Sequence, residues 1–316
     1  MRVASRGNSL HRGSSLDIHR HTVPSAAAAA ELERTALMQS HLNRLAIRSL
    51  LAACALALLC FAWSGSAQAA PLPNLTLTIA KSSITVGGST QSGGVNLTAT
   101  ATGVKEPSAV LFLIRPGVTT SEVESALKGS KDPNKTSRYG SIVFDAEIPT
   151  GKSAEAQTYL QPGQYLALLP GEGKSAGAHT FFTVTPSPSP VALPVAQATI
   201  RSIEFGFLGP KTLHDGELVR FEDEGFLVHM DVAFPVKSLR AAKQVVQGMH
   251  SGHEKGLQKL AAGQPFEFQG PVSHEAFQQV TITAKPGWYV QACFMETQDG
   301  RIHTVLGMER IIKITK

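Results

Sequence analysis

The chain has 316 residues, enough for about two domains of ordinary size. Its composition, 42% hydrophobic and 17% charged, excludes wholesale disorder, and a mean hydropathy of zero with one long apolar run excludes several membrane spans. The formal net charge of +5 would suit an anionic partner such as nucleic acid, and three cysteines are too few for a disulfide scaffold.

The first 69 residues predict a leader for export. An apolar run of about 14 residues, Leu50–Trp63, follows Arg44 and Arg48 and precedes the small-residue site Ala67–Ala69. A basic segment, a short apolar segment and an A-x-A site are typical of a cleavable secretory signal, here with translation starting at Met38. We therefore expect a secreted, periplasmic or cell-envelope protein, the alternative being a tilted single-pass anchor.

Cleavage would remove most of the unusual charge. Residues 1–69 hold seven of the 29 basic and three of the 24 acidic residues, so that 22 and 21 remain. No cluster of Lys and Arg with aromatic residues survives, and we expect neither a nucleic-acid partner nor a membrane span. Cys54 and Cys60 leave as well. The remaining Cys293 is then a buried inert thiol, an intermolecular bridge or a metal ligand.

The exported part is predicted to consist of two halves, 70–185 and 196–316, on either side of a semi-rigid proline-rich linker at 186–195. Short segments rich in alternating or β-branched residues and bounded by turn residues predict strands. They are Leu75–Ile84, Gly94–Thr102, Ala109–Ile114, Ala198–Phe205, Leu218–Phe221, Phe226–Phe234, Gln278–Ala284, Trp288–Met295 and Arg310–Thr315. About seven strands per half is typical of a β-sandwich.

The two halves also look like copies of one unit. Gln161–Tyr165 (QPGQY) matches Lys285–Tyr289 (KPGWY) at an offset of 124 residues, and His179 matches His303 at the same offset. Each half carries a short helical segment after its third strand, SEVESALKG in the first and LRAAKQVVQG in the second. The predicted fold class is therefore all-β, with two tandem Greek-key sandwiches, each with an inserted helix. In the second helix the apolar positions Leu239, Val245 and Val246 are expected to face a sheet.

The second half alone carries a set of residues suited to metal chemistry. His229, Cys293, His303 and Met308 follow one another in that order. A thiolate, two imidazoles and a weak axial thioether are the ligands of blue-copper sites, because they suit both Cu(I) and Cu(II). These four residues are the candidate metal ligands.

Around these residues the sequence resembles the cupredoxin family, in the segments Phe221–His229 and Pro286–Met308 (PGWYVQAC, then His, then Gly-Met). The resemblance implies one copper ion, with His229, Cys293 and His303 as equatorial ligands and Met308 as the axial one. It also implies electron transfer with a redox partner protein, or copper handling. The first half looks like a degenerate copy without the ligands. Met230 stands where many members have an asparagine that ties the ligand loops together.

Nine residues separate Cys293 from His303, which sets a geometric condition. If Asp299–Gly300 formed a two-residue hairpin turn, Glu296 would face His303 and Cys293 would lie about 10 Å away along the strand. Copper binding therefore requires residues 294–302 to form an open loop.

Other interpretations of these residues stay open. Cys293 could be a buried inert thiol, His229 a solvated side chain and His303 a loop residue. The chain would then be a metal-free binding or structural module of the cell envelope. His250 and His253 form an H-x-x-H pair, which is either a solvated helix junction or a surface zinc or copper site.

Enzyme motifs are missing from the sequence. It contains no HExxH, GxSxG or phosphate loop, and the His-x-His spacing that further copper centres need is found at His19 and His21, inside the leader. The prediction from the sequence is that the chain is not an enzyme.

Overall fold

The computed structural model describes residues 71–316 apart from 106, 128–132, 171–176 and 254, so the predicted leader lies outside the described residues. Residues 69–316 form one compact unit. Within the described part of this unit, no helix is both long and apolar enough to cross a membrane. The domain boundaries predicted inside the unit stay predictions.

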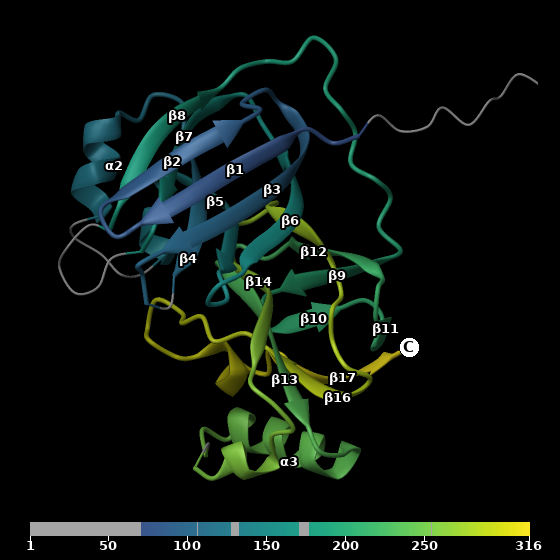
Figure 1. Ribbon diagram of the computed structural model, residues 1–316. Helices are drawn as coiled ribbons and strands as arrows, with labels where there is room; N and C mark the ends of the chain where they lie inside the picture. The colour runs from purple at the N-terminus through teal and green to yellow at the C-terminus, as the bar shows by residue number, and fades with distance from the viewer. Residues whose placement is uncertain (1–70, 106, 128–132, 171–176, 254) are drawn as a thin grey trace, which may run out of the picture. The chain divides into compact units, whose positions relative to one another are not determined.

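The largest sheet has eight strands and draws them from both halves of the chain (Figure 1). In spatial order these are β10 (Gly206–Leu208), β9 (Ala198–Ile203), β12 (Leu218–Asp223), β15 (Phe277–Thr281), β6 (Ser153–Leu160), β3 (Gly93–Thr102), β1 (Asn74–Ala80) and β2 (Ser83–Gly88). The halves meet where Gln279 of β15 pairs with Gln157 of β6.

Each half adds a smaller sheet. The second half contributes β11 (Thr212–His214), β17 (Glu309–Thr315), β16 (Gly287–Ala292), β13 (His229–Val236) and β14 (Phe266–Val272). The first half contributes β5 (Gly140–Glu147), β4 (Ser108–Ile114), β7 (Gly163–Leu168) and β8 (His179–Val184). One core cluster packs Phe221 of the large sheet against Phe268, and another packs Leu97 against Phe144. The predicted all-β sandwich class is confirmed.

Two helices, three single 3₁₀ turns and the strands account for the regular structure of the described residues. Helix α2 (Thr120–Leu127) begins with a capping box, in which Thr119 N–H donates to the Glu122 carboxylate at 2.8 Å and Glu122 N–H donates to Thr119 Oγ1 at 3.3 Å. Helix α3 (Leu239–His250) begins after Ser238. The 3₁₀ turns are η1 (Pro133–Thr136), η2 (Leu257–Leu260) and η3 (His303–Leu306).

Helix α3 packs its small and aliphatic residues against β13, β16 and β17, as Figure 1 shows. Ala241, Ala242, Val245 and Met249 are buried. The prediction was right for Val245 but wrong for Leu239, which is 38% exposed. Leu239 is the first helical residue and precedes Ala241, where the buried face of α3 begins.

Several strand ends differ from the predictions, and two of them lie beside candidate ligands. The predicted strand Leu75–Ile84 is a hairpin of β1 and β2 with a turn at Lys81–Ser82. Strand β13 begins at His229 rather than Phe226, and its register against β14 shifts on either side of Asp231. Strand β16 ends at Ala292, three residues before the predicted end. Regular strand pairing therefore stops at the candidate ligand residues.

The two matching segments have the same local structure. Tyr165 O–H donates to Gln161 O at 2.9 Å, and Tyr289 O–H donates to Lys285 O at 2.7 Å. Each tyrosine thus ties the start of its strand to the residue four positions earlier. Duplication of the whole half stays a prediction.

The proline-rich segment between the halves is bonded to both of them. Gly94 N–H donates to Val191 O at 2.7 Å, and the Gln279 side chain donates to Pro194 O at 3.0 Å. The linker therefore lies along the large sheet rather than spanning open solvent.

A half-buried acid, Glu267, lies where the smaller sheets approach one another. The backbone N–H of Glu147 on β5 donates to Glu267 Oε2 on β14 at 3.3 Å. Burial, with a smaller contribution from the Glu147 carboxylate, raises the pKa of Glu267 from 4.5 to about 7. The pKa of Glu267 is higher in the folded state than in the unfolded chain, so its ionisation weakens the fold. Its contribution to the free energy of unfolding therefore falls between pH 4.5 and about 7 and is constant above pH 7.

We expect Glu267→Gln to become progressively more stable than the parent as the pH rises. The gain in free energy of unfolding between pH 4 and pH 8 should be on the order of 2 kcal/mol, since glutamine carries no charge to bury. Urea unfolding at both pH values measures it. The exposed Glu155→Gln on β6 is the control and should show little change. An equal Glu267→Gln difference at both pH values would contradict the expectation.

Candidate metal centre

Three of the predicted ligands form one buried group. His229 is the first residue of β13, Cys293 directly follows β16, and His303 opens η3. They are 1%, 0% and 0% exposed. Within the described residues, this is the one set of three His, Cys, Asp or Glu side chains that could hold a metal ion.

The donor atoms are spaced like the ligands of a single ion. His229 Nδ1 and His303 Nδ1 are 3.2 Å apart, and Cys293 Sγ lies 3.4 Å from His303 Nδ1 and 3.8 Å from His229 Nδ1. A trigonal ion with bonds of about 2.0 Å to nitrogen and about 2.3 Å to sulfur would hold its donors about 3.5 and 3.8 Å apart. The observed triangle matches this spacing, so the residues fit a metal ion.

The segment between Cys293 and His303 explains how they meet. Its tip is a three-residue hairpin: Gly300 N–H donates to Thr297 O and Thr297 N–H donates to Arg301 O, both at 2.9 Å. Gly300 has φ of 79°, which this turn requires. The two-residue turn is therefore not formed, and His303 N–H donates to Met295 O at 2.8 Å. The expectation that residues 294–302 must form an open loop is therefore wrong: they form a hairpin, and its three-residue turn still leaves Cys293 Sγ 3.4 Å from His303 Nδ1 rather than about 10 Å away.

Beyond this hairpin the chain folds back over Cys293. Cys293 N–H donates to Met308 O at 3.1 Å, and Met308 N–H donates to His303 O at 3.0 Å. Gly307, with φ of 102°, ends η3 and allows the return. Met308 is fully buried and belongs to the same core cluster as Cys293. Its role as a ligand stays a prediction.

Burial sets the protonation states of the three donors. It lowers the pKa of His229 and of His303 to about 4, so both imidazoles are neutral at pH 7 and can act as donors. Burial also raises the pKa of Cys293 to about 12. The thiol therefore ionises at neutral pH only when a metal ion supplies positive charge, and binding releases a proton.

The surroundings fix the sulfur and one imidazole. Met230 N–H donates to Cys293 Sγ at 3.4 Å, and the Phe205 ring meets the His303 ring edge-on at 5.3 Å. A hydrogen bond to a ligating sulfur tunes the potential of a copper site. Phe205 has φ of 59°, a strained conformation for an aromatic residue. Met230 thus contributes its backbone N–H to the site.

Gly225 lies against the outer edge of His229. A Cβ atom at this position would be 2.5 Å from His229 Nε2 and 2.9 Å from Glu204 Oε1. The Nε2 atoms of both histidines are buried and bond to no described protein atom, so their Nδ1 atoms are the ones directed at Cys293. Only glycine leaves His229 its present position.

We expect Gly225→Ala to displace the His229 ring and weaken metal binding by roughly 10-fold to 100-fold, as is usual when support of a ligand is lost. A competition titration with Cu(II) measures the change. Gly206→Ala is the control, because its nearest neighbouring atom would be 3.6 Å away. Equal affinities of the two variants would show that His229 tolerates the methyl group.

A buried polar network lies next to the site and was missed in the sequence. The Gln291 side chain donates to Asp231 Oδ2, and Arg310 Nε donates to Gln291 Oε1 at 2.6 Å. The Arg310 guanidinium also donates to the carbonyls of Phe207 and Gly209, each at 3.2 Å. Burial raises the pKa of Asp231 to about 7. The sequence signal that could have revealed this network is a polar residue at an inward-facing position on each of the strands β13, β16 and β17.

The alternative interpretations can now be compared with the structure. A solvated His229 is wrong, since its side chain is buried. His303 does lie in the connection between β16 and β17, as the alternative held, but its side chain is buried beside Cys293. In the H-x-x-H pair, His250 Nδ1 lies 3.3 Å from Glu309 Oε1, and the pair belongs to no group of three donors within the described residues.

No family model matches the chain, and no curated protein matches it. Solved structures that are similar include reduced auracyanin from Roseiflexus castenholzii, 16% identical over 37% of this chain and 95% of that chain, with a TM-score of 0.23. Copper nitrite reductase from Nitrosomonas europaea is 12% identical over 77% and 94%, with a TM-score of 0.23. A multicopper oxidase is 12% identical over 77% and 88%, with a TM-score of 0.21.

Two of these similar structures are enzymes, which corrects one prediction. The sequence predicted that the chain is not an enzyme, because the motifs of catalysis were missing. The similarity to a multicopper oxidase and to a nitrite reductase overturns that exclusion. What the donor group itself supports is a site that could hold a metal ion.

Proposed function

We propose that this chain is an exported protein that binds one copper ion at His229, Cys293 and His303, with Met308 as a weak axial ligand. Its function would be electron transfer to and from a partner protein, or copper handling. The observation that carries the proposal is the buried triangle of two Nδ1 atoms and one Sγ, with sides of 3.2, 3.4 and 3.8 Å.

The donor set selects the metal. A thiolate with two imidazoles suits copper in both oxidation states, whereas magnesium and calcium prefer oxygen donors. When bound, copper would supply one-electron chemistry. The chain's own part is to hold the donors in one geometry. Met230 N–H orients the sulfur, Phe205 backs one imidazole, and the backbone bond from Cys293 to Met308 joins the last two ligand segments.

Burial of the group favours electron transfer over simple storage. All three donors are almost completely shielded from solvent, and the cage is bonded to regular strands on two sides. A rigid, dry site changes little between oxidation states, so an electron can leave or enter without rearrangement of the ligands. Export is supported by the sequence of the predicted leader.

Addition of Cu(II) to the reduced full-length protein tests the proposal. We expect an intense visible absorption from thiolate-to-copper charge transfer, and stabilisation by about 2.7 kcal/mol when free copper is 100 times its Kd. Zn(II) is the control, because it can occupy the same donors without giving colour. A colourless protein with unchanged unfolding would support the metal-free module instead.

Electrochemistry then separates the two roles. An electron-transfer protein should cycle reversibly between oxidation states without releasing the ion, whereas a copper-handling protein should lose Cu(I) to a chelator on the timescale of the cycle. Voltammetry with and without a Cu(I) chelator distinguishes these outcomes.

A further inference from the structure

One side chain from the first half is bonded to both ligand segments of the second. Asn134, in η1, accepts a hydrogen bond from Val228 N–H at 2.9 Å through its Oδ1. Its Nδ2 donates to Glu296 O at 3.1 Å. Val228 precedes His229, and Glu296 lies in the segment between Cys293 and His303.

The chemistry of the amide explains why asparagine stands there. Val228 offers a donor and Glu296 an acceptor, so the bridging group must accept on one side and donate on the other. A carboxylate could accept from Val228 but could not donate to Glu296, and an aliphatic residue could do neither. The two contacts also fix which way the amide points, because the flipped amide would set donor against donor.

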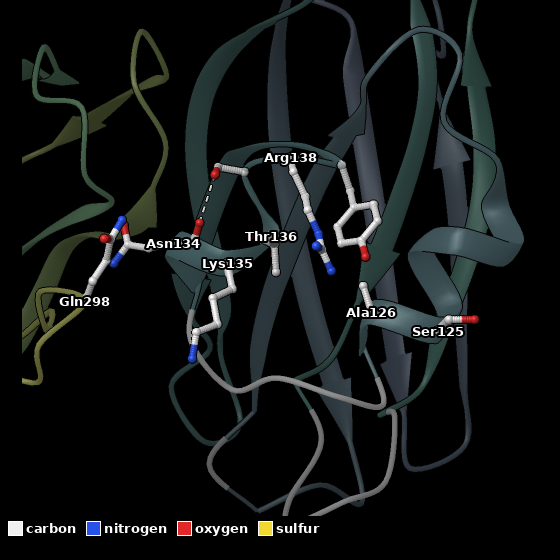
Figure 2. A pocket seen from close by; sticks show the side chains of 9 residues that line it. Ser125, Ala126, Asn134, Lys135, Thr136, Arg138 and Gln298 are labelled. Carbon is white, nitrogen blue, oxygen red and sulfur yellow. Dashed lines mark hydrogen bonds between the residues drawn. The ribbon is translucent and has the colours of Figure 1, made fainter.

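The surrounding residues place this bridge at the contact between the halves. Asn134 and Gln298, from the tip of the hairpin after Cys293, line the same cavity of about 680 Å³. Figure 2 shows Asn134 coming from the first half and Gln298 from the second. Ser137 O–H donates to Asn134 O at 2.8 Å and helps to hold η1 in place.

We infer that Asn134 is a positioning residue that clamps the His229 segment to the segment between Cys293 and His303. The inference rests on the proposed copper site. It assigns the first half a task, which is to complete the frame of a metal centre whose ligands all lie in the second half. Met230 cannot provide this link with its side chain, because a thioether has no N–H to donate.

Hydrogen exchange in the metal-free, full-length protein tests the clamp without copper. In Asn134→Ala we expect the amide of Val228 to exchange about tenfold faster because it loses its acceptor, and the peptide 294–302 to exchange about tenfold faster because the hairpin loses its anchor at Glu296 O and opens more often. Asn134→Asp keeps the acceptor but not the donor, so Val228 should stay protected while 294–302 exchanges faster. Asn74→Ala, which removes a side-chain bond between Asn74 and Asn96 within the first half, is the control.

A second readout measures the effect on the metal. Asn134→Ala should weaken Cu(II) binding roughly 10-fold or more relative to Asn74→Ala, and should shift the charge-transfer band. If exchange and affinity both equal those of Asn74→Ala, the clamp is wrong. If exchange accelerates but no variant, nor the parent, binds copper, the clamp stands and the proposed function fails. If copper binds with unchanged affinity in Asn134→Ala, the inference is overturned while the proposed function stands.

Discussion

Replacing Cys293 with serine is expected to abolish the visible absorption of the copper-loaded protein. The band would come from charge transfer out of the sulfur, and a hydroxyl is a poor substitute for a soft thiolate. The structure places Sγ 3.4 Å from His303 Nδ1 and 3.8 Å from His229 Nδ1, and this is the one cysteine sulfur among the described residues. Copper affinity should fall with the band, because the two imidazoles and the weak Met308 thioether would remain without an anionic donor.

Absorption spectra and a competition titration measure both effects, and circular dichroism checks that the fold persists. Cys60→Ser in the predicted leader is the matched control and should keep the full band. If Cys293→Ser stays coloured, or if Cys60→Ser loses its colour, the assignment of the thiolate is wrong.

Replacing Gln291 with leucine should destabilise the metal-free protein by about 3 kcal/mol, because it removes the side-chain donor of the buried Asp231 carboxyl and one of the bonds of the partly buried Arg310 guanidinium. The Gln291 amide is fully buried and is the link between the Asp231 carboxylate and the Arg310 guanidinium. Leucine is similar in size, so the loss would come from hydrogen bonding and not from a cavity. The Asp231 carboxyl would then keep no side-chain donor among the bonds described.

Urea unfolding at pH 7 measures the free energy, with Gln164→Leu as the control. Gln164 lies on β7, is exposed and donates only to Thr183 Oγ1, so its loss should cost less than about 0.5 kcal/mol. A Gln291→Leu cost below about 1 kcal/mol would mean that water replaces the amide in this network.

The order of the ligand types was enough to predict the site, but not its construction. His229, Cys293 and His303 were found from their chemistry, and the structure brings them together. The conformation between Cys293 and His303 depended on whether the turn has two or three residues. Both turns suit an Asp-Gly sequence, and the register is decided by the bond from His303 N–H to Met295 O.

Contacts between segments that are far apart in the sequence could not be predicted from it. Asn134 lies 94 residues from Val228 and 162 from Glu296, and neither its type nor its neighbours suggested a link to a ligand. Strands were predicted best where β-branched residues alternate, as in β3 and β12. Strands of mixed composition such as β6 (SAEAQTYL) were missed, because pairing with β3 and not propensity makes them extended.

The joining of β15 to β6 has a consequence for any shortened version of this protein. β6 and β15 are each the last strand of the large sheet within their own half, and each is covered by the other. A chain that starts after the linker would leave one side of β15 open, with its backbone N–H and C=O groups directed at solvent. Exposed strand edges recruit further strands from other molecules. The half that carries the copper ligands should therefore aggregate when it is produced alone.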